Sequence, residues 1–197
     1  MAEVSTRTAR RAFSVAFGAA LGGLVSGCGA AGVQGDPNAP VLPVWVGREQ
    51  DLFDDVVDPA SLGLGADVSN PRKDPLLKER ARASELVSRV RVSTVTVESL
   101  EQVRTYRLVI QVLPPPFGAP AVEQTAFELV VGPTAPSYGV AKAFDMRLRG
   151  ASFIGFLRRF AGDGDEPSKL HWHLSPDTAE VAAAVTDALA LAELSGS

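Results

Sequence analysis

The two histidines of the chain, His171 and His173, are two positions apart in the stretch KLHWHL. Residues two apart on a β-strand point to the same side, so both imidazoles could bind one transition-metal ion. A catalytic zinc site takes three protein ligands and keeps an open position. The acidic residues considered for the third ligand are Asp163, Asp165, Glu166 and Asp177. The alternative, which we favour, is that the imidazoles stack or form hydrogen bonds near the edge of a sheet.

A row of acidic residues in the stretch DLFDDVVDP is a second possible site. Its aspartates, Asp51, Asp54, Asp55 and Asp58, have the spacing of one face of a helix. A calcium-binding loop needs alternating oxygen ligands and a glycine at its sharp turn, and this stretch lacks that pattern. We therefore expect a solvated acidic helix face here.

Sequence motifs for nucleophilic catalysis or phosphate binding are missing. The chain has no Gly-x-Ser-x-Gly nucleophile elbow and no glycine-rich loop of the phosphate-binding type. Arg158 and Arg159 form a small basic pair, and we expect one of them to pair with a nearby carboxylate. A non-enzymatic role is therefore favoured over an enzymatic one.

The first 28 residues carry a targeting pattern. Three arginines precede an apolar run from Ala12 to Val25, which has the length of a signal-peptide core and is too short to span a bilayer as a helix. The run ends in Val25-Ser26-Gly27-Cys28. This sequence resembles the lipobox of bacterial lipoproteins, which has an aliphatic residue, two small residues and then a cysteine.

The resemblance implies that residues 1–27 are a cleaved signal peptide and that Cys28 becomes the lipid-bearing N-terminus. Cys28 would carry a thioether-linked diacylglycerol and an N-acyl chain, which together anchor a protein to a membrane lastingly. Cys28 is the single cysteine of the chain, so no disulfide is expected. Residues 28–43 then form a flexible tether and residues 44–197 a single domain, with no cofactor besides the lipid.

Two further features bear on the route and the destination. Arg10-Arg11-Ala12-Phe13 resembles a twin-arginine export signal, and the general export route fits the same segment equally well, so both stay open. The residue after Cys28 is Gly29 and not aspartate. By resemblance to lipoprotein sorting in Gram-negative bacteria, this favours the outer membrane of the cell envelope, on its periplasmic or its outer side.

The charge of the chain excludes one class of partner. The formal net charge is −4, and removing residues 1–27 takes away three of 19 basic and one of 23 acidic residues, which leaves −6. Nucleic-acid binding needs clustered lysines and arginines for phosphate contacts. We therefore expect no nucleic-acid partner.

The pattern of apolar residues predicts an α+β fold. Asp74-Pro75 begins a helix over about 74–86, and Ser175-Pro176 begins a second helix over about 176–194. Strands are predicted at 43–47, 88–99, 105–113, 125–131, 144–150, 152–160 and 169–174, although a helix is the alternative for 144–150. The second and third should form an antiparallel hairpin, with a bulge near Ser93 or Thr94. Together these elements make an antiparallel sheet of five to seven strands with both helices on one face.

The expected function follows from the anchor and from the missing motifs. We expect a membrane-anchored lipoprotein of the bacterial envelope that acts as an interaction or accessory subunit with an envelope protein partner. One alternative is a metal-binding protein or metal-dependent hydrolase that uses His171 and His173. A second alternative is a carrier of an apolar ligand or lipid.

Overall fold

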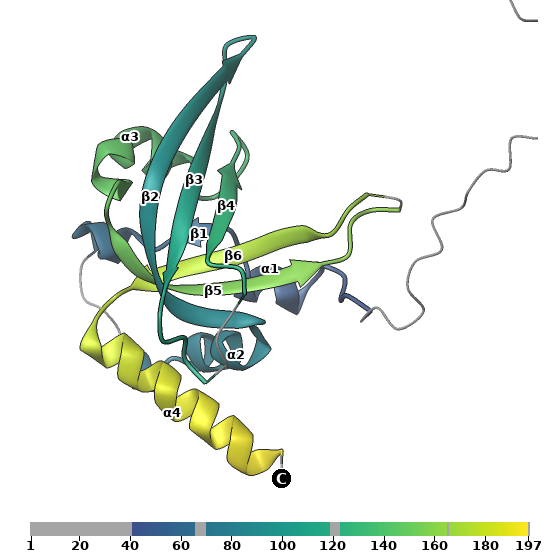
Figure 1. Ribbon diagram of the computed structural model, residues 1–197, viewed down its shortest axis with the longest axis vertical. Coiled ribbons are helices and arrows are strands. Elements are labelled where there is room, and N and C mark those ends of the chain that lie inside the picture. The colour runs from purple at the N-terminus through teal and green to yellow at the C-terminus, as the bar shows by residue number, and fades with distance from the viewer. Residues whose placement is uncertain (1–40, 66–69, 119–122, 165, 197) are drawn as a thin grey trace, which may run out of the picture. The chain divides into compact units, whose positions relative to one another are not determined.

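The computed structural model describes residues 41–65, 70–118, 123–164 and 166–196 (Figure 1). The predicted signal peptide, the lipobox and nearly all of the tether lie outside these residues. The helices and strands are α1 (Arg48–Leu52), β1 (Val56–Val57), α2 (Pro75–Ala83), β2 (Leu86–Leu100), β3 (Val103–Leu113), β4 (Ala126–Val131), α3 (Tyr138–Leu148), β5 (Ser152–Phe160), β6 (Lys169–Pro176) and α4 (Ala179–Ser195). Two short 3-10 helices, η1 (Pro59–Leu62) and η2 (Pro71–Lys73), precede α2.

The fold is α+β, with one curled sheet of six strands in the order β1-β6-β5-β2-β3-β4. Four of the neighbouring pairs are antiparallel, but β1 runs parallel to β6. The prediction of a wholly antiparallel sheet was therefore wrong. Parallel neighbours need a long connection, and here nearly the whole domain lies between β1 and β6, so local sequence pattern carries no sign of this pairing.

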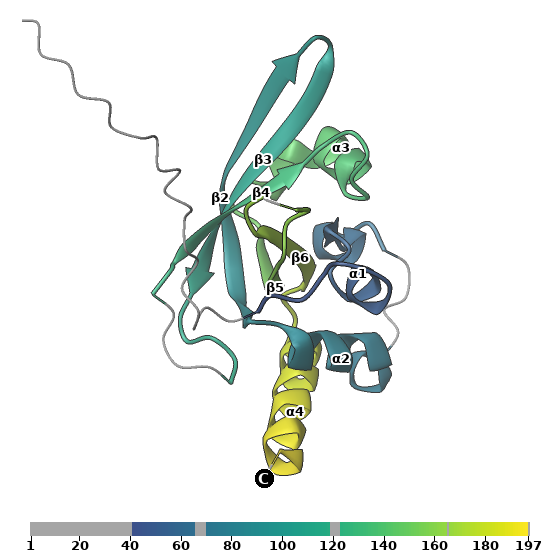
Figure 2. The ribbon, with the colours of Figure 1, turned by 90° about the vertical axis from the view of Figure 1, so that its right-hand side faces the viewer.

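The structure confirms the predicted β2–β3 hairpin and its bulge. Its register shifts between Val92 and Thr94, and its two-residue turn consists of Glu101 and Gln102, both at positive φ. Beyond the residues that pair with β5 and β4, the hairpin projects as a two-stranded arm past the rest of the sheet (Figures 1 and 2).

The two predicted helices pack on the same face of the sheet. Figures 1 and 2 place α2 beside α4, and their buried residues Leu77, Ala81, Val185 and Ala188 share one core with Phe156 of β5. Helix α2 begins as predicted, because the Asp74 carboxylate caps it by accepting the Leu76 backbone N–H (2.9 Å).

The ends of these helices differ from the prediction. Helix α2 stops at Ala83 because strand β2 begins at Leu86. Helix α4 starts at Ala179, capped by Thr178, because β6 continues through Pro176. Asp177, which was expected in the first helical turn, instead forms an ion pair with Arg89 at 3.0 Å.

The opposite face of the sheet is covered by a helix where the sequence analysis favoured a strand. Tyr138–Leu148 form α3, which is kinked at Phe144, where φ and ψ are not helical. Its buried residues Ala141 and Leu148, one on each side of the kink, join the core of this face. The alternation within 144–150 favoured a strand, and the two-helix prediction is corrected accordingly.

The stretch 43–47 was also predicted to be a strand. It is irregular up to Val46 and pairs with no strand among the described residues. No helix in the described part of the chain is long and apolar enough to cross a membrane.

Candidate functional site

The acidic row of residues 51–58 lies against β6. Helix α1 ends at Leu52, and Leu52 and Phe53 are buried in the core beside α2 and α4. Because the chain leaves the helix at Phe53, Asp54 and Asp55 turn toward β6 and not toward solvent. The expected solvated helix face is therefore absent at these two residues, and each carboxylate contacts one of the predicted histidines.

His171 pairs with Asp55. The distance from His171 Nδ1 to Asp55 Oδ2 is 2.8 Å, and Asp55 Oδ1 accepts the Trp172 backbone N–H at 3.1 Å. The ring of His171 also contacts an aromatic side chain. The Trp45 ring stacks on the imidazole with 3.7 Å between centroids and an interplanar angle of 7°. Trp45 Nε1 donates to the Phe53 carbonyl at 2.9 Å. His171 therefore holds the N-terminal segment through both a carboxylate and an aromatic ring.

His173 pairs with Asp54 and is more deeply buried. The Nδ1–Oδ1 distance is 2.7 Å, and the residue is 8% exposed beside the ring of Phe156. Burial lowers the pKa of His173 below its ordinary value, against the opposing effect of Asp54, and the nearby positive charge of Arg80 lowers it further. The neutral imidazole then donates its Nδ1–H to Asp54.

Arg80 is a functional neighbour that the sequence analysis did not identify. It is 5% exposed, and its Nε donates to the Leu52 carbonyl at 2.5 Å at the end of α1. Its guanidinium lies 5.9 Å from the Phe156 ring centroid, and burial lowers its pKa despite the nearby Asp54. Position 80 follows Leu77 by three residues, so the helical spacing placed it on the core-facing side of α2.

The residues considered for a third metal ligand are engaged elsewhere. Asp163 and Glu166 pair with Lys169, at 3.6 Å and 2.6 Å, and Asp177 pairs with Arg89. Asp165 lies outside the described residues. Within the part of the chain that the structure describes, no three His, Cys, Asp or Glu side chains are grouped to hold a metal ion. Both imidazoles are hydrogen-bonded near the sheet edge, and that of His171 is also stacked on Trp45, which agrees with the arrangement that we favoured.

The basic pair next to this site behaves as expected. Arg158 contacts the Glu49 carboxylate of α1 at 3.2 Å, which adds a further link between the N-terminal segment and β5. Arg159 donates to the Gln124 side chain at 3.0 Å. The predicted pairing of one arginine with a carboxylate is confirmed.

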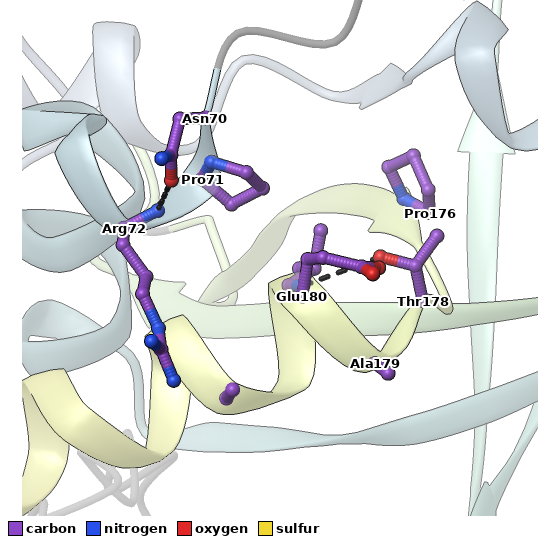
Figure 3. Close-up of a pocket in the computed structure, with 9 residues that line it drawn as sticks. Asn70, Pro71, Arg72, Pro176, Thr178, Ala179 and Glu180 are labelled. Carbon is purple, nitrogen blue, oxygen red and sulfur yellow. Dashed lines mark hydrogen bonds between the residues drawn. The ribbon is translucent and has the colours of Figure 1, made fainter.

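Two surface hollows bear on ligand binding. One, of about 470 Å³, lies beside the His171–Asp55 pair. It is lined by Trp45, Gln50, Asp54, Asp55, Thr134, Ala135, Pro136 and His171. A larger one, of about 610 Å³, lies between η2 and the start of α4 (Figure 3). Figure 3 shows Asn70, Pro71 and Arg72 on one side of it and Pro176, Thr178, Ala179 and Glu180 on the other. Neither cysteine nor histidine lines this larger hollow.

The described contacts of the site join the start of the domain to the rest of the fold. Two carboxylates, two imidazoles, one guanidinium and one indole fasten residues 45–55 to the sheet and to α2. Cys28 and the other residues of the lipobox lie outside the described residues. No protein-family model, curated protein or solved structure matches the chain.

Proposed function

We propose that the protein is a lipid-anchored lipoprotein of a bacterial envelope, whose domain serves as a non-enzymatic interaction or accessory subunit. The observation that carries this proposal is the sequence Val25-Ser26-Gly27-Cys28 at the end of a basic and then apolar leader. Such a leader directs export, and acylation of the cysteine fixes the mature chain to a membrane.

The position at which the domain starts supports the role of the segment after Cys28 as a tether that holds the domain near the membrane. Among the described residues, the backbone hydrogen bond nearest this end runs from the Ala161 N–H to the Pro43 carbonyl, at 2.8 Å. The fifteen or so residues between Cys28 and Pro43 would span roughly 20 Å as a flexible coil. An anchor on Cys28 would therefore hold the domain close to the membrane surface.

The histidine–aspartate pairs show how the start of the domain is attached. Each Nδ1 atom contacts a carboxylate, and both carboxylates, Asp54 and Asp55, lie near the start of the domain. Trp45, Arg80 and Arg158 reinforce the same attachment. We assign these residues the role of fastening the start of the domain, which the tether would join, to the sheet.

Replacement of the lipid-bearing cysteine tests the anchor. Cys28→Ser should move the protein from the detergent phase to the aqueous phase, or leave it with an uncleaved signal peptide. Ser26→Ala is the matched control, because a small residue at this position keeps the lipobox pattern, and it should stay in the detergent phase. A Cys28→Ser chain that has lost its signal peptide and still partitions with membranes would refute the lipid anchor.

A second experiment tests the interaction role. The lipidated protein is purified from detergent-solubilised membranes of the native cell, and the proteins that accompany it are quantified. A partner present in stoichiometric amount is the expected result. An accessory role would be contradicted if the lipidated protein were recovered in full amount from the membranes and no stoichiometric partner accompanied it.

A further inference from the structure

We propose that the outer edge of β4 pairs with the β4 strand of a second copy of this chain, forming a two-fold dimer with one continuous sheet. Strand β4 is the last in the sheet order and pairs with β3 along its whole length. No strand pairs with its other side in the described part of the chain. The opposite edge strand, β1, has only two residues, so β4 is the longer free edge.

The hydrogen bonds to β3 determine which backbone groups of β4 face outward. The Thr125 carbonyl accepts from Val112 on β3 at 2.9 Å, and successive residues of an antiparallel strand bond to alternate sides. Residues 127, 129 and 131 therefore bond toward β3, and residues 126, 128 and 130 face outward. In agreement, the Gln124 side chain donates to the Ala126 carbonyl at 2.9 Å. Glu128 and Val130 are left as the free positions of the edge.

The side chains of β4 do little to block pairing. Natural edge strands are protected by charged side chains, above all lysine, by proline or by a bulge, and residues 126–131 contain no lysine, proline or bulge. The one charged residue, Glu128, forms an ion pair with Arg107 on β3, so its charge is compensated. Val130 is 48% exposed on the same face, whereas Leu129 is buried on the other face. The core thus extends up to an unprotected edge.

The sequence of β4 selects one register. A two-fold axis at Leu129 places Glu128 opposite Val130 of the second copy, and the reverse, so that their outward N–H and C=O groups form four hydrogen bonds. An axis at Glu128 would place the two glutamates directly opposite each other, which is unfavourable. An axis at Val130 would pair Glu128 with Gly132, which lies beyond the end of β4. We therefore assign the register centred on Leu129, which pairs the two free positions with each other. A closed dimer with a two-fold axis is also the commonest form of protein self-association.

This pairing goes beyond the proposed function and does not require the lipid anchor. The contact is small, so the dimer should be weak in dilute solution. Anchoring two copies in one membrane would raise their effective concentration and favour the pair.

Cross-linking in the membrane tests the register. In the full, lipidated chain Cys28 is blocked, so Val130→Cys introduces the single reactive thiol. The two Val130 positions are diagonal neighbours about 7–8 Å apart in the assigned register, within reach of a short bismaleimide. Val97→Cys, at a half-exposed valine on the projecting arm, is the matched control. We expect at least about tenfold more dimer from position 130 than from position 97, equivalent to about 1.4 kcal/mol.

A solution measurement completes the test. The Cys28→Ser chain is examined by sedimentation at about 10 to 200 µM, and Val130→Lys should weaken its self-association at least about tenfold. Two results together would overturn the proposal: the Cys28→Ser chain with Val130 unchanged stays monomeric over this concentration range, and positions 130 and 97 cross-link equally. Cross-linking of position 130 to a protein of another mass would also overturn it. Failure of the lipid anchor has a separate signature, because an unmodified Cys28 would itself react with maleimide.

Discussion

Arg80 offers the sharpest test of how the N-terminal segment is held, since it is the buried cation that α2 contributes to this attachment. Replacing it by alanine removes the hydrogen bond to the Leu52 carbonyl and the weaker contact with the Asp51 carbonyl at 3.4 Å. A hydrogen bond to a charged group contributes about 1.5–3 kcal/mol, and its loss leaves a buried carbonyl unpaired. Relief of the desolvated guanidinium offsets part of this loss.

We therefore expect Arg80→Ala to lower the free energy of unfolding by about 2–3 kcal/mol. For a domain of this size each kcal/mol shifts the thermal midpoint by about 2–4 °C, which gives a decrease of about 4–12 °C. The assay is urea unfolding of the Cys28→Ser chain, with the slope of free energy against urea used to check that the cooperative unit is unchanged.

Two control variants show whether the hydrogen bonds of Arg80 cause the loss of stability. Arg72→Ala removes an arginine whose ion pair with Asp187 is exposed, and it should change the free energy of unfolding by less than about 1 kcal/mol. Arg80→Met keeps most of the buried stem and removes only the donors, so it should remain less stable than the wild type. If Arg80→Ala cost no more than Arg72→Ala, or if Arg80→Met were as stable as the wild type, the hydrogen bonds of Arg80 would not be what holds α1.

The remaining predictions concern the two histidines. Because burial lowers the pKa of His173 below its ordinary 6.5, the unfolded chain takes up a proton first as the pH falls. Stability should therefore be lost below about pH 6.5, down to the folded-state pKa, by at most about 1.4 kcal/mol per pH unit. Urea unfolding between pH 7.5 and 5 measures this, and the loss should be smaller in His173→Gln; an equal loss in that variant would assign it to other groups. Elemental analysis of the purified domain should find less than about a tenth of a transition-metal ion per chain, since a stable zinc site takes at least three protein ligands. A stoichiometric metal content that disappears in His171→Ala would restore the metal hypothesis.

The sequence determined the elements whose signals are local. Asp74-Pro75 starts α2 because a carboxylate and a proline both suit the first turn of a helix, whatever lies around it. The β2–β3 hairpin and its bulge follow from alternating β-branched residues with a change of phase and a short connection. The lipobox is likewise a contiguous motif, and the prediction that rests on Cys28 comes entirely from it.

Tertiary structure decided the elements whose signals depend on distant neighbours. Residues 144–150 alternate like a strand, but burial of Ala141 and Leu148 on a sheet face makes them part of α3. The two residues of β1 lie parallel to β6 because Leu52 and Phe53 beside them are buried in the core. Neither outcome follows from propensity, which is weak over so few residues.

The candidate site shows the same division. The sequence identified His171, His173 and the acidic row separately, from residue type and spacing. Only the fold brought Asp54 and Asp55 against these histidines, across more than a hundred residues of chain, and placed each imidazole in a hydrogen-bonded pair. The physical reason is that a carboxylate or an imidazole finds its partner by proximity in space, which the packing of α1, α2 and β6 establishes.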